Sequence, residues 1–169
     1  MSLKNAMKQS CDTYFYEVAR LLGVDRLKVT AEKFGLGKKV LGDYFDYEKS
    51  GLFPNTKWKK NNLGKGWVLG ETLITGIGQG YTQTTPLQLC LMTAQIANGG
   101  YSIKPRIVVN NNPMSLEEAK SKFQEETLHG HEKKLFKDHK NIKIIQEAMF
   151  SSTNELRGTS YKSRIDDPK

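Results

Sequence analysis

Three adjacent small polar residues, Ser10, Cys11 and Asp12, have the side chains in this chain that are best suited to chemistry. They lie between two segments in which apolar residues recur at helical spacing, Leu3–Met7 and Tyr14–Leu22. On one continuous helix, side chains two positions apart would point about 200° away from each other, so residues 10 and 12 could not serve one cleft. If the chain instead breaks between two helices, both can face a common site, with Ser10 or Asp12 supplying the N-cap oxygen of the second helix. The triplet also fits a helix cap without catalytic meaning, because cap signals of this kind are common.

Two further stretches give this triplet a context. The first is glycine-rich and runs into a helix start, GIGQGYTQTTPLQL at residues 76–89, and the second is ANGGYSIKP at residues 97–105. The glycine run lacks the Lys-Ser/Thr pair of a P-loop, which argues against nucleotide binding. Together with CDTYFY at residues 11–16, the two stretches resemble the transpeptidase domain of the class B penicillin-binding proteins, within them the penicillin-binding protein 2 group. The resemblance is close over residues 3–109 and loose over the tail.

Members of this family carry three motifs, which are Ser-x-x-Lys with the nucleophile, Ser-x-Asn or Ser-x-Asp, and Lys-Thr/Ser-Gly. Only the middle motif occurs here, because no serine is followed three residues later by a lysine and no Lys-Thr-Gly or Lys-Ser-Gly is present. Residues 151–160 resemble the helix end and loop that precede the third motif. We therefore expect residues 1–169 to be a partial transpeptidase domain that begins after the nucleophile and stops before the third motif. Within it, residues 1–3 read as a cloning remnant, 4–109 as a helical lobe and 110–169 as a variable tail.

The resemblance implies a function and roles for two residues. The family cross-links the stem peptides of peptidoglycan by serine acyl-enzyme chemistry and binds penicillin and other β-lactams. Ser10 would relay a proton between the motif lysine and the leaving group, and Asp12 would face the substrate or the side-chain amide of a β-lactam. An ionised aspartate only accepts hydrogen bonds, so Asp12 would act as an acceptor or an orienting group. Without the other two motifs, we expect this fragment to be inactive by itself.

The two cysteines lie in different settings. Some members of the penicillin-binding protein 2 group bind a structural zinc ion through the cysteine of the same triplet and upstream Asp and His residues, but this sequence supplies only Cys11. The alternative is that Cys11 is a small residue packed under the motif, and the chemistry itself requires no cofactor. Cys90 lies in an apolar run and is expected to be a core residue.

Composition limits the partners. The net charge is +8, carried by 21 lysines and only 5 arginines that are scattered along the chain. A protein that recognises nucleic acid would be expected to carry more arginines, with aromatic residues between them, so we expect no nucleic-acid partner. No apolar stretch approaches the roughly 20 residues of a membrane span, and we expect a soluble fragment. The resemblance implies a full-length protein held in the inner membrane with a periplasmic catalytic domain and with elongation-machinery membrane proteins as partners. A basic helical interaction module without catalysis is the alternative function.

The apolar spacing predicts helices over residues 12–22 and 25–34, a long irregular region over 35–80, a helix over 85–98 and a strand over 103–109. The helix at 85–98 starts with Thr, Pro and a Gln three residues after the Thr, which is a strong start signal. It should be the most buried helix. The apolar face expected for it comprises Leu87, Leu91, Ala94 and Ala97, broadened by Leu89, Met92 and Ile96.

The sequence of the tail predicts a charged helix over residues 116–125 and a last helix that ends near Ser152. Between them lie His129, His131 and His139, which form no recognisable metal-ligand set. The tripeptide 152–154 also spells Ser-x-Asn, but it lies at a helix end and is assigned no catalytic role. The predicted fold is therefore mainly α with short strands, the helical subdomain of a penicillin-binding transpeptidase fold without most of its five-stranded sheet. Helix faces that the sheet would cover should make the fragment self-associate.

Overall fold

The computed structural model describes residues 1–42, 45–105, 134–138 and 140–164. The helix predicted over 116–125 and the three histidines, His129, His131 and His139, lie outside these residues. The described helices are α1 (Leu3–Lys8), α2 (Asp12–Leu22), α3 (Val24–Lys33), α4 (Thr56–Leu63), α5 (Leu69–Thr75), α6 (Pro86–Ala97), α8 (Lys140–Asn154) and the short 3-10 helix η2 (Tyr161–Ser163). Over these residues the chain is helical with two isolated β-bridges, Leu52 with Gln83 and Tyr101 with Lys134. The predicted mainly helical fold without most of the sheet is confirmed.

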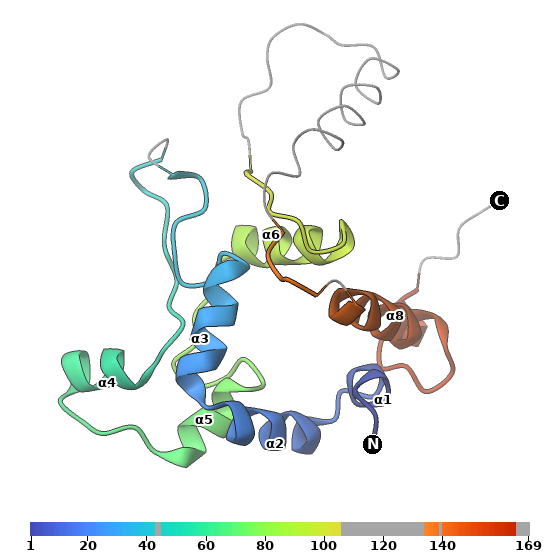
Figure 1. Ribbon diagram of the computed structural model, residues 1–169, viewed down its shortest axis with the longest axis horizontal. Coiled ribbons are helices and arrows are strands. Elements are labelled where there is room, and N and C mark those ends of the chain that lie inside the picture. The colour runs from blue at the N-terminus through green and yellow to red at the C-terminus, as the bar shows by residue number, and fades with distance from the viewer. Residues whose placement is uncertain (43–44, 106–133, 139, 165–169) are drawn as a thin grey trace, which may run out of the picture.

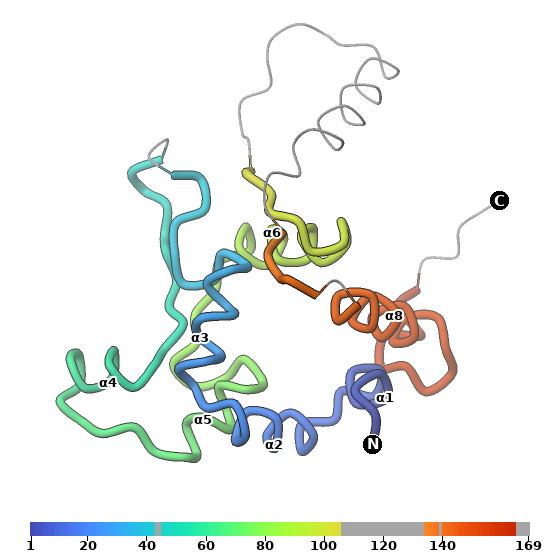
Figure 2. Tube along the Cα trace, viewed as in Figure 1, coloured from blue at the N-terminus to red at the C-terminus, as the bar shows by residue number. Residues whose placement is uncertain are grey.

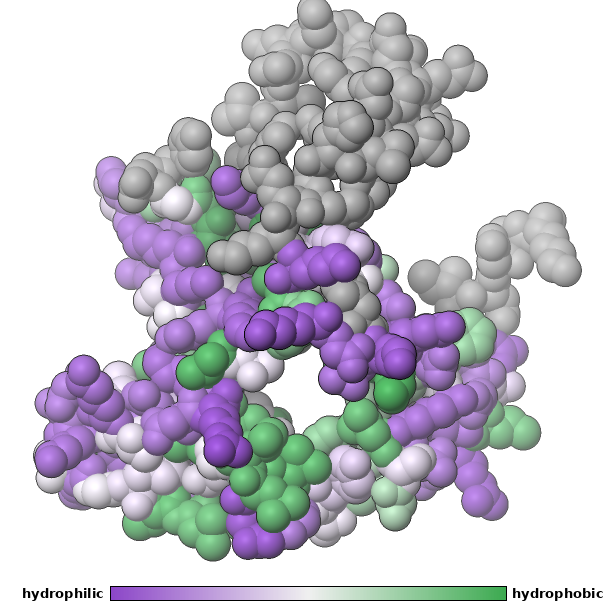
Figure 3. All heavy atoms as spheres, in the orientation of Figure 1, coloured by the Kyte–Doolittle hydropathy of each residue, from purple (hydrophilic) through white to green (hydrophobic). Residues whose placement is uncertain are grey.

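The helices follow one another around a ring. Figures 1 and 2 show α2, α3, α6 and α8 arranged in turn, with α8 returning to lie against α1, so that the two ends of the described chain meet. Figure 3 shows an opening through the middle of this ring, with apolar side chains gathered along its border over the region of α2 and α5. Several large apolar side chains of these helices are accordingly exposed, Leu21 by 65% and Leu69 by 57%. The ring has no single continuous interior.

The core is small and lies where α3 meets the loop that follows it. Ala31, Leu36 and Phe53 are buried together, and Leu27 and Met92 pack against them. Gly35 lies in this packing with a φ of +94°, and a Cβ there would come within 3.0 Å of the side chains of Leu91 and Val40. Glycine is thus required both by the backbone conformation and by the close approach of α6.

Helix α6 begins as predicted but buries a different face. Thr85 caps it, with its hydroxyl accepting a hydrogen bond from the Gln88 N–H at 3.2 Å, and the Gln88 side chain accepts from the Thr85 N–H at 3.0 Å. The completely buried Gln88 side chain also donates to the backbone carbonyls of Lys38 and Ser50, each at 2.8 Å. Gln95 donates in the same way to Phe34. Two glutamines therefore fasten α6 to the loops, because those loops have backbone carbonyls that need donors.

Other predictions for this part of the chain were wrong. The expected apolar face of α6 is only partly buried, since Leu91 is buried while Leu89 and Ala97 are exposed. Cys90 is exposed and is not a core residue. Residues 103–105 form no strand, and the rest of the expected strand, residues 106–109, lies outside the described residues. The irregular region 35–80 contains two helices, α4 and α5.

Helices α4 and α5 are joined by a buried ion pair rather than by an apolar face. The Lys59 ammonium donates to the Glu71 carboxylate, and their side chains are only 7% and 14% exposed. Glu71 also accepts from the Val68 N–H at 3.0 Å at the start of α5. Burial by itself would raise the pKa of Glu71, but the hydrogen bonds from Lys59 and Val68 outweigh it and lower that pKa. Helix α5 in turn packs on α2, which carries the predicted site.

Candidate active site

The predicted break between two helices is present at the triplet. Helix α1 ends at Lys8, and the Cys11 N–H donates to the Ala6 carbonyl at 2.9 Å while the Ser10 N–H donates to Met7 at 3.2 Å. These two bonds are the pair that closes a helix in a Schellman motif, which places the residue at position 10 in the left-handed conformation. Ser10 has a φ of +50°. Holding a serine there costs roughly 1 to 2 kcal/mol relative to a right-handed conformation.

The expected capping role of the triplet was wrong in detail. Cys11 is the N-cap of α2, and its side chain makes no cap hydrogen bond, so neither Ser10 nor Asp12 supplies an N-cap oxygen. Asp12 instead occupies the first turn of α2, where a carboxylate is stabilised by the positive end of the helix dipole. The Asp12 side chain is exposed.

Ser10 meets the far end of the chain. Its hydroxyl lies 2.9 Å from the hydroxyl of Thr159, and either oxygen can donate the hydrogen bond. The Ser152 hydroxyl lies 3.4 Å from the same Thr159 oxygen. We call Ser10, Ser152 and Thr159 the hydroxyl cluster. Its members come from the helix break, from the end of α8 and from the loop that follows α8.

The loop after α8 is held against α1 and α8 by backbone contacts. The Thr159 N–H donates to the Lys8 carbonyl at 3.0 Å, and the Ser160 N–H donates to the Ser152 carbonyl at 3.2 Å. A Cβ at Gly158 would collide with the Ser152 carbonyl, so only glycine lets the loop approach the end of α8 this closely. The glycine therefore sets the position of Thr159 beside Ser10.

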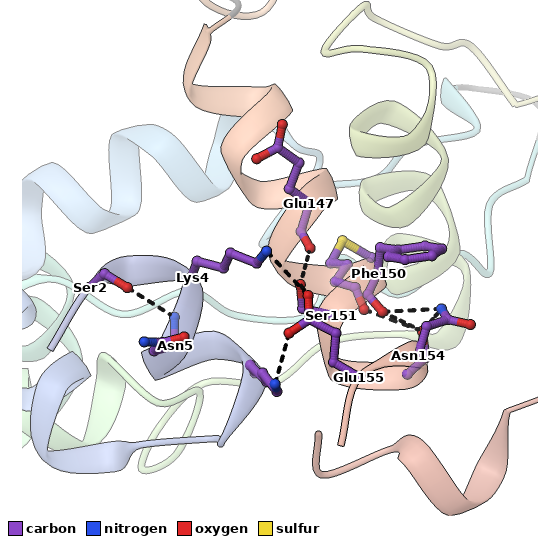
Figure 4. A network of polar contacts seen from close by, with 11 residues as sticks. Ser2, Lys4, Asn5, Glu147, Phe150, Ser151, Asn154 and Glu155 are labelled. Atoms are coloured by element: carbon purple, nitrogen blue, oxygen red, sulfur yellow. Dashed lines mark hydrogen bonds and ion pairs between the residues drawn. The ribbon is translucent and has the colours of Figure 1, made fainter. Parts of the chain in front are cut away.

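A network of charged groups lies beside the hydroxyl cluster (Figure 4). The Glu155 carboxylate accepts from Lys8 at 2.8 Å and from the Ser151 hydroxyl at 2.8 Å, and it pairs with Lys4 at 3.2 Å. Ser151 also donates to the Glu147 carbonyl, whereas the Glu147 carboxylate points away from Glu155. The hydrogen bonds from Lys8, Ser151 and Lys4 lower the pKa of Glu155 to about 2 from an ordinary value of 4.5.

Cys11 does not lie among metal ligands. Its sulfur is 3.3 Å from the Thr13 hydroxyl, and this hydrogen bond, together with the backbone N–H of Tyr14, lowers the pKa of the thiol. Over the described residues, no group of three histidine, cysteine, aspartate or glutamate side chains is arranged to hold a metal ion. The residues present here therefore do not fit a zinc site, and no step of the chemistry below passes through zinc.

Sequence reasoning found Ser10 but not its hydroxyl partners. Ser152, which was assigned no role as part of the Ser-x-Asn tripeptide, belongs to the hydroxyl cluster through its contact with Thr159. One feature of the sequence could have predicted the position of Thr159. Residues 151–160 resemble the loop before the third motif, and a loop that leads to the third motif would pass close to the second motif.

Ser10 on the helix break thus lies beside Thr159, in a loop that returns from the far end of the chain. The chain matches the family described as the penicillin binding protein transpeptidase domain over residues 1–167. It belongs to this family.

The relatives and solved structures that it resembles name one group within the family. Peptidoglycan D,D-transpeptidase MrdA of Acinetobacter baumannii is 39% identical over 108 residues, covering 64% of this chain and 16% of that protein. MrdA of Escherichia coli is 30% identical over 163 residues, covering 96% of this chain and 24% of that protein. Pseudomonas aeruginosa PBP2 in complex with WCK 5153 has a TM-score of 0.75 at 37% identity, over 96% of this chain and 34% of that one.

The Helicobacter pylori complex between PBP2 and MreC gives a TM-score of 0.77 at 29% identity, over 96% of this chain and 28% of the matched chain. The chain thus spans a quarter or less of the length of the two MrdA proteins and about a third or less of the two solved chains. No helix within the described residues is long and apolar enough to cross a membrane.

Proposed function

We propose that this chain is the part of a peptidoglycan D,D-transpeptidase of the penicillin-binding protein 2 group that supplies the second catalytic motif. The observation that carries this proposal is the contact of Ser10 with Thr159, which joins the second motif to the loop expected to lead to the third. Such an enzyme cross-links stem peptides through a serine acyl-enzyme and is acylated by penicillin. The nucleophilic serine, its lysine and the lysine of the third motif are absent from this sequence.

Ser10 is the proton-relay residue in this proposal. Acyl transfer from a stem peptide requires that a proton reach the leaving amine as the nucleophile attacks. The Ser10 hydroxyl is both donor and acceptor, so it can take a proton on one side and deliver one on the other. Its left-handed backbone presents the hydroxyl at the end of α1 instead of along the helix, and the Thr159 hydroxyl restricts its rotation.

Asp12 is the substrate-facing residue. Its carboxylate is exposed at the start of α2, two residues after Ser10, and accepts hydrogen bonds only. It is therefore matched to an N–H donor, such as the amide of a stem peptide or the side-chain amide of a β-lactam. Cys11 lies between the two as a packing residue.

The rest of the proposal concerns the whole protein. Residues 4–109 form its helical lobe, and residues 110–169 form a tail leading towards the third motif. The reaction uses side chains alone and requires no cofactor. Its catalytic domain lies in the periplasm and is anchored to the inner membrane, with elongation-machinery membrane proteins as partners. The Helicobacter pylori PBP2 solved with MreC supports this choice of partner.

The test is acylation of the full-length protein by a fluorescent penicillin, followed as a second-order rate constant. Ser10→Ala is expected to lower this constant about 100-fold, the lower end of what a positioned proton-transfer group contributes. Ser50→Ala is the matched control, since within the described residues the exposed Ser50 hydroxyl donates only to the neighbouring Gly51 carbonyl. An unchanged rate in Ser10→Ala would remove Ser10 from the mechanism.

A further inference from the structure

We propose that Glu155 is a positioning residue, which acts through Lys8 to hold Thr159 against the proton-relay serine. This inference rests on the proposed function and extends it to a residue outside the three family motifs. The charged network and the hydroxyl cluster share the last turn of α1, and this shared element connects Glu155 to Ser10.

Lys8 is the residue on which the two sets of contacts converge. Its ammonium donates to Glu155 at 2.8 Å, and its backbone carbonyl accepts from the Thr159 N–H at 3.0 Å. Lys8 precedes Ser10 by two residues, and Glu155 precedes Thr159 by four. The loop between Glu155 and Thr159 is thereby attached to one residue of α1 at both of its ends. The Ser10 and Thr159 hydroxyls then come together at 2.9 Å.

The charges explain why a carboxylate is needed at position 155. Lys4 and Lys8 are four residues apart on α1, so their ammonium groups lie on the same side of the helix and repel each other. The Glu155 carboxylate pairs with both ammonium groups and offsets their positive charges. Without it, the repulsion would turn the Lys8 side chain away from α8, and the loop would lose its side-chain contact with Lys8 while keeping the backbone bond from the Thr159 N–H to the Lys8 carbonyl.

Partial exposure of the network predicts an effect on geometry more than on stability. The side chains of Lys8 and Glu155 are 14% and 41% exposed, and ion pairs in contact with water contribute little to stability. Small displacements of reacting groups, by contrast, change rates strongly, by up to about 100-fold for 1 Å. Loss of Glu155 should therefore slow acylation while the protein remains folded.

The experiment is a double-mutant cycle on the full-length protein with a fluorescent penicillin. Glu155→Ala is expected to lower the acylation rate constant about tenfold in the wild-type background and less than twofold in the Ser10→Ala background, because its effect passes through Ser10. Glu147→Ala is the matched control, since it removes a carboxylate on α8 that points away from the network. Circular dichroism and the Tm report whether each variant is folded.

A second variant separates charge pairing from a general loss of folding. The exchanged pair Lys8→Glu with Glu155→Lys restores an ion pair of opposite direction and is expected to recover most of the lost rate. An equal loss from Glu155→Ala in both backgrounds, no loss in the wild type, or no recovery in the exchanged pair would overturn the positioning role. An unchanged rate in Ser10→Ala alone would instead overturn the proposed function on which it rests.

Discussion

The hydroxyl oxygens of Ser10 and Thr159 lie 2.9 Å apart, although the two residues are 149 positions apart in the chain. Ser10 owes its position to the hydrogen bonds that end α1, and Thr159 owes its position to a glycine that lets its loop pass close to α8. The contact therefore depends on both the helix end and the loop, which the bond from the Thr159 N–H to the Lys8 carbonyl also joins.

Thr159→Val tests whether this contact orients the serine. Valine has nearly the shape of threonine and removes only the hydroxyl, so the Ser10 hydroxyl would rotate more freely. We expect the acylation rate constant of the full-length protein to fall about tenfold, less than in Ser10→Ala. Thr159→Ser keeps a hydroxyl and should retain most of the rate. If valine and serine at position 159 behaved alike, the hydroxyl would have no orienting role.

The low pKa of Glu155 predicts a pH dependence of stability. The pKa falls from 4.5 in the unfolded chain to about 2 in the folded one, so the carboxylate stabilises the fold fully above about pH 4.5. This contribution, which water screens because the Glu155 side chain is 41% exposed, is lost as the pH falls from about 4.5 to about 2. Glu155→Gln removes the titrating group, and the difference in Tm between it and the wild type should shrink across that window. Thermal unfolding from pH 6 to pH 2 measures it, and a constant difference would contradict the assignment.

The Lys59–Glu71 pair predicts an asymmetric response to mutation. Lys59→Met leaves the Glu71 carboxylate buried without its main partner, which is expected to lower the free energy of unfolding by roughly 3 kcal/mol. Combining Lys59→Met with Glu71→Gln removes the unpaired charge and should recover part of this loss. Lys60→Met, at the next and exposed position, is the control. Urea denaturation measures the free energy of unfolding of the three variants. Equal losses of this free energy in Lys59→Met and Lys60→Met would contradict a stabilising role for the pair.

Exposed apolar side chains on α2 and α5 predict self-association of the 169-residue chain. Leu21 on α2 is exposed by 65% and Leu69 on α5 by 57%. Contiguous apolar patches of more than a few hundred Å² are uncommon on monomers. Light scattering should therefore give a mass above that of one chain, and Leu21→Glu with Leu69→Glu should reduce it. A monomer at all concentrations would show that these side chains do not form a binding surface.

Local signals account for what the sequence could predict. The break at Ser10–Asp12 and the start of α6 depend on residues within a few positions of each other, and both were found. Helices α4 and α5 were not predicted because they are short. They are held by the Lys59–Glu71 ion pair, and such a pair leaves no periodic pattern of apolar residues in the sequence. Asn55 at the start of α4 and Gly64 at its end were usable signals, since Asn55 caps the Trp58 N–H and Gly64 adopts the left-handed conformation.

Long-range contacts set the limit for the site. Spacing alone could not place Thr159 beside Ser10 or Glu155 beside Lys8, because each contact depends on the path of the whole ring. The exposure of Cys90 also depends on contacts between distant parts of the chain. An apolar run predicts a buried face, but which side of α6 is covered depends on the loops that Gln88 and Gln95 fasten to it.

The closure of the ring between α1 and α8 bears on the order in which the chain folds. The Lys8–Glu155 contact joins residues 147 positions apart, and closing a loop of that length opposes folding by on the order of 4 kcal/mol of chain entropy. Contacts with so large an entropic penalty form late and open early, so the six-residue α1 should exchange its amide hydrogens faster than α3, whose neighbours are closer in sequence. The segment that carries Ser10 would then be the last part of the ring to become rigid and the first to be released.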